Sequence, residues 1–327
     1  MSNPYHDKKV LITGGLGFIG SNLARTLVRE GARVTLIDNL SPRCGGNQFN
    51  VAGIERKLRI VFGNAQDPAV LKPLLAGQDF LFNLAGQTSH QDSMLAPFED
   101  LHVNCEGPLA ALEAARLVNP EVRIVFASTR QVYGRPQYYP VDEKHPVLPV
   151  DINGVHKLAG EFYHQLYSQV HGLKTIILRL TNTIGPRMHI RDARQTFFGV
   201  WIRCAMEEQP FEVWGGSQLR DFTYIDDAVA ALLAAGTCPH SSGDIFNLGG
   251  DRVISLSDLA KMLVELRPKA SFKVRRYPAA RKVIDIGDYF ADDRKFREQT
   301  GWQPATPLPA AISRTLRFYD SHWKEYV

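Results

Sequence analysis

Short apolar runs alternate with stretches of helical periodicity through the first half of the chain. The runs lie at residues 9–14, 33–38, 58–63, 79–85, 123–128 and 175–182. Residues 19–31, between the first two runs, carry apolar side chains at spacings of three and four, as one face of a helix does, and Gly31 is a typical helix end. Near-continuous apolar strands that alternate with helices predict an α/β fold with a doubly wound parallel sheet.

The pattern loosens after about residue 182. Residues 199–209 and 254–267 have helical periodicity, residues 211–216 suit a short strand and turn, and residues 274–293 are polar and irregular. We therefore predict a first domain over residues 1–182 and a smaller C-terminal substrate-binding lobe over residues 183–327, with some late segments returning to the first domain.

A glycine motif joins the first strand to the first helix. Gly15, Gly17 and Gly20 have the spacing that permits a tight turn and lets backbone amides approach a pyrophosphate at the helix N-terminus. Asp38 ends the second strand, 21 residues after Gly17. A carboxylate there bonds the ribose hydroxyls of NAD and repels the 2′-phosphate of NADP. The motif predicts a Rossmann-type sheet that binds NAD.

Composition narrows the class of protein. The chain has 327 residues, 44% hydrophobic and 22% charged, with a net charge of +4 and no basic stripe, so we expect no nucleic-acid partner. It has neither a signal-peptide core nor a run of roughly 18 apolar residues, so we expect no membrane partner. Its four cysteines are scattered without metal-ligand spacing. These features predict a cytoplasmic protein without a metal site.

Several motifs in a fixed order resemble one family over nearly the whole chain. They are "TGGLGFIG", "DNL", "NLAGQ", "STRQVYG", the helix around Lys157, "LRLTNTIGP" and "RDFTYIDD". Together they resemble the extended short-chain dehydrogenase/reductase family, and within it the NAD-dependent nucleotide-sugar epimerases and dehydratases, of which UDP-glucose 4-epimerase is an example. The resemblance implies a cytoplasmic NAD-dependent enzyme of carbohydrate metabolism that acts on a nucleotide diphosphate-sugar, most simply a UDP-sugar, and forms a homodimer through a helix bundle.

The resemblance also implies residue roles. Lys157 would bind the nicotinamide ribose and lower the pKa of a neighbouring acid/base group. Asn64 stands where the family usually has an aspartate near the adenine. The cofactor-binding residues would be Gly14, Gly17, Phe18, Ile19, Gly20, Asp38, Asn39, Asn64, Ala65, Leu84, Ala85, Gly86, Asn104 and Lys157.

Substrate contacts are implied at both ends of the site. The residues are Gln87, Thr129, Asn182, Phe197, Trp214, Arg220 and Arg281, with Thr129 on the reacting sugar oxygen and the two arginines on the diphosphate. Alternatively, Phe197 and Trp214 are core residues, and Arg220 forms a surface ion pair with Asp221 or Asp226. Sugar 4,6-dehydratases have Asp and Glu after the Thr129 position, where this chain has Arg130 and Gln131. An epimerase is therefore favoured over a 4,6-dehydratase.

The catalytic tyrosine of the family is replaced. Its position, four residues before Lys157, holds Asn153, and an amide is no general base near neutral pH. One explanation is that another group supplies the base: His90, His156, Glu143 and Tyr133 are candidates, and His90, after "NLAGQTS", is the first to test.

Two further explanations stay open. The chain is an engineered inactive variant, or it is a non-catalytic NAD and nucleotide-sugar-binding protein. A sugar-nucleotide lyase or net oxidoreductase is a further enzymatic alternative. The leading interpretation is an NAD-dependent epimerase-like enzyme with altered proton transfer, whose catalytic residues are Thr129, Lys157, Asn153 and His90.

Overall fold

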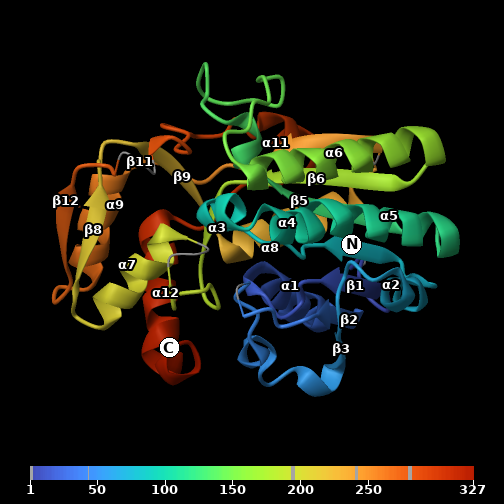
Figure 1. Ribbon diagram of the computed structural model, residues 1–327. Coiled ribbons are helices and arrows are strands. Elements are labelled where there is room, and N and C mark those ends of the chain that lie inside the picture. The colour runs from blue at the N-terminus through green and yellow to red at the C-terminus, as the bar shows by residue number, and fades with distance from the viewer. Residues whose placement is uncertain (1–2, 43, 193–195, 240–241, 279–281) are drawn as a thin grey trace.

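A seven-stranded parallel sheet forms the larger of two lobes in the computed structural model, which describes residues 3–42, 44–192, 196–239, 242–278 and 282–327 (Figure 1). In sheet order, the strands are β3 (Leu58–Phe62), β2 (Arg33–Asp38), β1 (Lys9–Thr13), β4 (Phe80–Asn83), β5 (Arg123–Thr129), β6 (Lys174–Leu180) and β10 (Ser242–Asn247). The six apolar runs are confirmed as β1 to β6. The order reverses between β1 and β4, where doubly wound sheets bind ligands at the carboxyl ends of their strands.

Helices cover both faces of this sheet (Figure 1). The chain runs through α1 (Phe18–Arg29), α2 (Pro68–Leu75), α3 (His90–Leu95), α4 (Pro97–Leu101), a π-helical turn (His102–Glu106), α5 (Gly107–Val118), α6 (Ile152–His171), α8 (Ile225–Thr237) and α11 (Arg294–Thr300). The helices α2, α5 and α6 pack together on one side, and α1 packs against α8 on the other. Both α8 and β10 pack on the large sheet although they follow residue 182.

The helix α6 begins and ends for identifiable local reasons. Asp151 is its N-cap residue and accepts a hydrogen bond from the backbone N–H of Gly154 at 2.7 Å. Gly172 ends the helix in the left-handed conformation, with φ of 70°. The helix expected around Lys157 is thus confirmed, and its first turn carries Asn153 and its second Lys157.

The described residues of the smaller lobe form two short sheets, covered by helices (Figure 1). The strands β11 (Val253–Ser255), β9 (Leu219–Tyr224) and β7 (Asn182–Ile184) form one sheet, and β12 (Ser271–Arg275) pairs with β8 (Pro210–Trp214) in the other. The helices are α7 (Phe197–Met206), α9 (Leu256–Leu266) and α12 (Leu308–His322). The expected helices and strand at residues 199–267 are confirmed as α7, β8 and α9. The polar segment at residues 274–293 begins with the end of β12, which its pattern did not predict.

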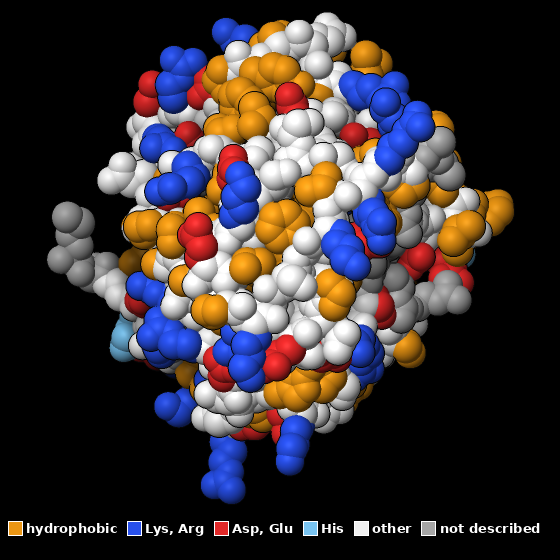
Figure 2. Space-filling model, turned by 90° about the vertical axis from the view of Figure 1, so that its left-hand side faces the viewer, with side chains coloured by type: hydrophobic (Ala, Val, Ile, Leu, Met, Phe, Trp, Pro, Cys, Tyr) orange, Lys and Arg blue, Asp and Glu red, His pale blue; other side chains and the backbone are white. Residues whose placement is uncertain are grey.

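Basic side chains are spread over the outer face of the smaller lobe. Figure 2 shows Lys and Arg interspersed with acidic and apolar side chains on this face rather than gathered into one stripe. Across the described ranges, none of the helices combines the length and the apolar character that crossing a membrane requires.

One buried histidine generates a prediction about acid stability. His164 on α6 is fully buried, stacks on Phe126 with 4.4 Å between ring centroids, and donates from Nδ1 to the Gly160 carbonyl at 2.7 Å. Burial lowers the pKa of His164 to about 4. The unfolded chain therefore binds a proton on this residue at higher pH than the folded chain does. The stability from neutral His164, roughly 3 kcal/mol, is present above about pH 6.5 and is lost as the pH falls towards 4.

We expect the free energy of unfolding of His164→Asn to fall less steeply than that of the unmodified protein as the pH is lowered from 7 to 4. Urea denaturation at each pH measures this free energy. The slope is compared with that of His102→Asn, which changes an exposed histidine. If the free energy of unfolding depended on pH equally in the two variants, burial of neutral His164 would not be the source of the acid sensitivity.

Candidate active site

A cavity of about 530 Å³ opens at the carboxyl ends of the sheet strands, between the two lobes. Its walls come from the loops that follow β1, β2, β4, β5 and β6 and from residues of the smaller lobe, including Trp214 and Arg220. This is where a doubly wound sheet offers a ligand both backbone amides and side chains.

The glycine loop after β1 suits a dinucleotide. Gly14 has φ of +67°, and a Cβ there would lie 2.9 Å from Ala85 Cα; a Cβ on Gly20 would clash with the Gly14 carbonyl. Gly17 is the N-cap of α1 and provides no side-chain cap, so this helix end presents its backbone amides to the cavity. The loop therefore fits the pyrophosphate of NAD.

Asp38 is fixed at the tip of β2. Its two carboxylate oxygens accept hydrogen bonds from the backbone N–H groups of Leu16 at 3.0 Å and Leu40 at 2.8 Å. Burial raises its pKa, and these two hydrogen bonds oppose the rise. The side chain lines the cavity, in the position that suits ribose hydroxyls.

Most of the residues predicted to bind the cofactor border the cavity. They are Gly14, Gly17, Phe18, Ile19, Gly20, Asp38, Asn39, Ala65, Leu84, Ala85, Gly86 and Lys157. Asn64 and Asn104 are not part of this lining: exposed Asn64 accepts a hydrogen bond from Asn39 at 2.8 Å, and buried Asn104 donates to the Gln87 carbonyl at 2.9 Å. A Cβ on Gly86 would lie 3.0 Å from Lys157 Nζ and 3.1 Å from Asn104 Oδ1, so a larger residue here would displace these two side chains.

Lys157 reaches the cavity from the second turn of α6. Its Nζ donates to the Ala127 carbonyl at 3.1 Å and lies 5.0 Å from the centre of the Phe126 ring. Burial lowers the pKa of Lys157 to about 8, while the charges of Asp100 and Glu161 act in the opposite direction. The ammonium is therefore protonated in most molecules at neutral pH.

Asn153 is held by two hydrogen bonds. Its Nδ2 donates to the Gln87 carbonyl at 2.7 Å and to Oδ2 of Asp100 at 3.1 Å. The other oxygen of Asp100 lies 2.7 Å from Nδ1 of His156. Gln87 is buried, and its side chain turns back to the backbone of Ser89 instead of lining the cavity. Asn153 thus connects α6 to the loop after β4 and to α4.

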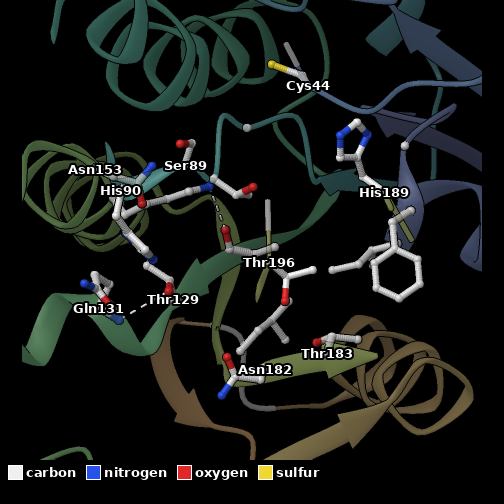
Figure 3. Close-up of a pocket in the computed structure, with 18 of the residues that line it drawn as sticks. Cys44, Ser89, His90, Thr129, Gln131, Asn153, Asn182, Thr183, His189 and Thr196 are labelled. Carbon is white, nitrogen blue, oxygen red and sulfur yellow. Dashed lines mark hydrogen bonds between the residues drawn. The ribbon is translucent and has the colours of Figure 1, made fainter. Parts of the chain in front are cut away.

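Asp151, at the start of α6, brings two further side chains together. Its Oδ2 accepts a hydrogen bond from Nε2 of Gln131 at 2.7 Å and lies 3.1 Å from Nδ1 of His90. The carboxylate is fully buried. Burial raises the pKa of Asp151, but His90, the Gly154 amide and Gln131 together outweigh burial and hold that pKa below its usual range. Figure 3 places His90, Asn153, Thr129 and Gln131 on one side of the cavity and His189 on the other.

Of the four candidate bases named above, His90 is the one that lines the cavity. The hydroxyl of Tyr133 is buried and donates to Asn247 at 2.7 Å, and burial raises its pKa to about 12. Glu143 accepts the Asn247 backbone N–H at 2.8 Å, and His156 is engaged by Asp100.

The substrate end of the cavity is lined by Thr129, Asn182, Phe197, Trp214 and Arg220. Arg220 is buried, with NH2 3.6 Å from Asp285, so the surface pair with Asp221 or Asp226 is wrong. Phe197 and Trp214 are half-buried cavity walls. Arg281 lies outside the described residues.

Arg130 also belongs to this end. Its NH2 donates to Asn182 at 2.9 Å, and its NH1 is buried without a hydrogen-bond partner within the described part of the chain. Burial and the charge of Arg220 lower the pKa of Arg130 to about 10, so the guanidinium remains a cation at neutral pH.

Sequence reasoning missed three positions that organise the site: Asp100, Asp151 and the partner of Arg220, Asp285. Asp151 carried one detectable signal, because an Asp directly before a helical pattern is a typical N-cap. The contacts of Asp100 and Asp285 join segments more than 50 residues apart and leave no local pattern.

Asp38 generates a prediction about cofactor choice. We expect Asp38→Asn to reduce the preference for NAD over NADP by about tenfold, because the variant loses a charge-assisted hydrogen bond and the repulsion of a 2′-phosphate. Calorimetric titration with each dinucleotide measures the ratio. Asp67→Asn removes the same charge at the N-cap of α2 and is the matched control. An unchanged ratio in Asp38→Asn would show that Asp38 does not face the ribose.

Comparison with known proteins gives this geometry a family. The chain is 30% identical over 316 residues, 94% of its length and 97% of the other, to a putative UDP-glucose 4-epimerase of Methanocaldococcus jannaschii. It is also similar to UDP-glucuronic acid decarboxylase 1 of Xenopus tropicalis, with 31% identity over 323 residues. The alignment covers 95% of this chain and 72% of the decarboxylase.

A solved structure of similar fold carries both ligands. It is UDP-glucuronic acid 4-epimerase from Bacillus cereus in complex with UDP-glucuronic acid and NAD, 25% identical, with a TM-score of 0.84 and coverage of 96% of this chain and 99% of that one. The NAD dependent epimerase/dehydratase family matches residues 10–249. The chain therefore belongs to the NAD-dependent epimerase/dehydratase family, and NAD is its cofactor.

Proposed function

We propose that the protein is an NAD-dependent nucleotide-sugar epimerase that oxidises one sugar carbon transiently and reduces it again from the other face. The observation that carries the proposal is the single cavity that brings the glycine loop, Asp38, Lys157 and Thr129 together with Asn182 and Arg220. The proposed substrate is a UDP-sugar, because the relatives and the similar structure act on or bind UDP-sugars.

The chain's own residues have defined tasks in this reaction. NAD, when bound, supplies the hydride acceptor and donor. Thr129 accepts the backbone N–H of Gln131 at 3.2 Å, which leaves its hydroxyl hydrogen for a sugar oxygen. Lys157 supplies positive charge beside the reacting group, and Arg220 faces the diphosphate.

Two side chains argue against simple 4,6-dehydration. Arg130 and Gln131 occupy the positions of the dehydratase carboxylates, and neither a guanidinium with a pKa near 10 nor an amide removes a proton from carbon. This supports an isomerase over a 4,6-dehydratase.

Asn153 also supports a working natural site over an engineered loss. Both hydrogens of its amide are used, one on the Gln87 carbonyl and one on Asp100. A tyrosine hydroxyl has a single hydrogen to donate and could not make both bonds. The asparagine therefore has a structural task that a tyrosine cannot perform.

We further propose that the protein forms a homodimer through α5 and α6. Val155, Phe162, Leu166 and Val170 follow one another at spacings of four and seven along α6, and each is about half exposed. An apolar row of this kind on a helix is typical of a surface that packs against another protein.

Incubation with NAD and a panel of UDP-glucose, UDP-galactose, UDP-glucuronate and the CDP-, GDP- and dTDP-glucoses tests the activity. We expect one nucleotide-sugar to convert to an epimer, and proton NMR measures this conversion. The near-ultraviolet absorbance of NADH should not rise, because the hydride returns to the sugar.

Each other outcome identifies a different function. Formation of stoichiometric NADH would indicate a net oxidoreductase. An unsaturated, decarboxylated or 6-deoxy keto product would indicate a lyase. Calorimetric binding of NAD and a UDP-sugar without any turnover would indicate a binding protein.

A further inference from the structure

We propose that His90, oriented by Asp151 and Gln131, is the acid/base residue that takes the proton from the sugar hydroxyl and gives it back. This inference rests on the proposed epimerase function. It assigns the proton transfer to a pair of residues from two separate segments, the start of α3 and the start of α6.

The geometry gives His90 one buried and one available ring nitrogen. Nδ1 is buried and lies 3.1 Å from the Asp151 carboxylate, within ion-pair distance although the angles are not those of a hydrogen bond. The side chain is 37% exposed, and the residue lines the cavity. A carboxylate beside Nδ1 favours the tautomer that carries its hydrogen there, which leaves Nε2 as the acceptor nitrogen of a cavity-lining side chain.

Asp151 is held where it can do this. The Gly154 amide binds Oδ1, and Gln131 binds Oδ2, so the carboxylate cannot rotate away from His90 without breaking two hydrogen bonds of 2.7 Å. Its negative charge also stabilises the imidazolium that forms when His90 accepts a proton. Gln131 thereby has a role in a position where a dehydratase uses a catalytic carboxylate.

Other polar groups near the reacting hydroxyl are less suited to the task. Asn153 has an amide, and its Nδ2 is committed to Gln87 and Asp100. Lys157 is mostly protonated at neutral pH and donates to the Ala127 carbonyl. Tyr133, with a pKa of about 12, is buried against Asn247.

The step balances in both directions. The O–H bond of the sugar breaks, its proton goes to Nε2 of His90, and the carbon gives its hydride to NAD as the C=O bond forms. In the return, the carbonyl carbon receives the hydride on its other face, and the imidazolium gives the proton back to the oxygen. No further oxidant or reductant is required.

The activity test uses the UDP-sugar of the panel that the unmodified protein converts. We expect His90→Ala to lower kcat by about a hundredfold or more with little change in KM, and added imidazole to restore part of the rate. His102→Ala, an exposed histidine on the same connection, is the matched control and should keep full activity.

Asp151→Asn tests the positioning role with the N-cap preserved, since asparagine also caps helices. We expect a fall in kcat of about tenfold or more that imidazole does not rescue. Nitrogen NMR of the ligand-free protein, with nitrogen-15 in its histidine rings, provides a second readout. The His90 ring should carry its hydrogen on Nδ1 in the unmodified protein and should lose this preference in Asp151→Asn.

The outcomes separate this inference from the proposed function. An active unmodified protein with a fully active His90→Ala variant, or an Nε2–H tautomer of His90, would overturn the role of His90 and leave the epimerase assignment standing. Absence of turnover by the unmodified protein across the panel would contradict the epimerase assignment itself, and the catalytic role of His90 with it.

Discussion

The Asp151 carboxylate is the constraint on which the geometry of the site depends. It caps α6 through the Gly154 amide, and this cap fixes the first turn of the helix that carries Asn153 and Lys157. Its second oxygen binds Gln131 and faces His90. A fully buried carboxylate is stable only if such partners satisfy it. The same interaction therefore positions the cofactor-side lysine and orients the histidine of the cavity.

A second network joins the loop after β4 to the same helix. The Gln87 carbonyl accepts hydrogen bonds from both Asn104 and Asn153, and Asp100 connects Asn153 to His156. Because His90 follows this loop directly, Asn153 also stabilises the segment that carries the proposed acid/base residue.

The sequence predicted the elements whose stability is local. The strands β1, β2, β4, β5 and β6 are largely buried, the edge strand β3 is partly exposed, and all six appear as apolar runs; α6 has both its N-cap and its C-terminal glycine. The strand β10 escaped prediction because "SGDIFN" has a glycine and an aspartate and pairs with β6 across more than 60 residues of chain. The sequence motifs also led to the glycine-loop and strand-end part of the cavity lining, since backbone turns and strand ends determine it.

The pairings inside the site required the structure. His90 and Asp151 are separated by 61 residues, and Arg220 and Asp285 by 65, so neither periodicity nor a short motif reports these contacts. A histidine at the start of a short helix is chemically ambiguous until its neighbours are known. With a buried carboxylate beside Nδ1 and its side chain in the cavity wall, His90 has the surroundings of a general base. The proposed proton transfer is thus assigned to the start of α3, which lies beside the start of α6 where Asp151 and Asn153 are found.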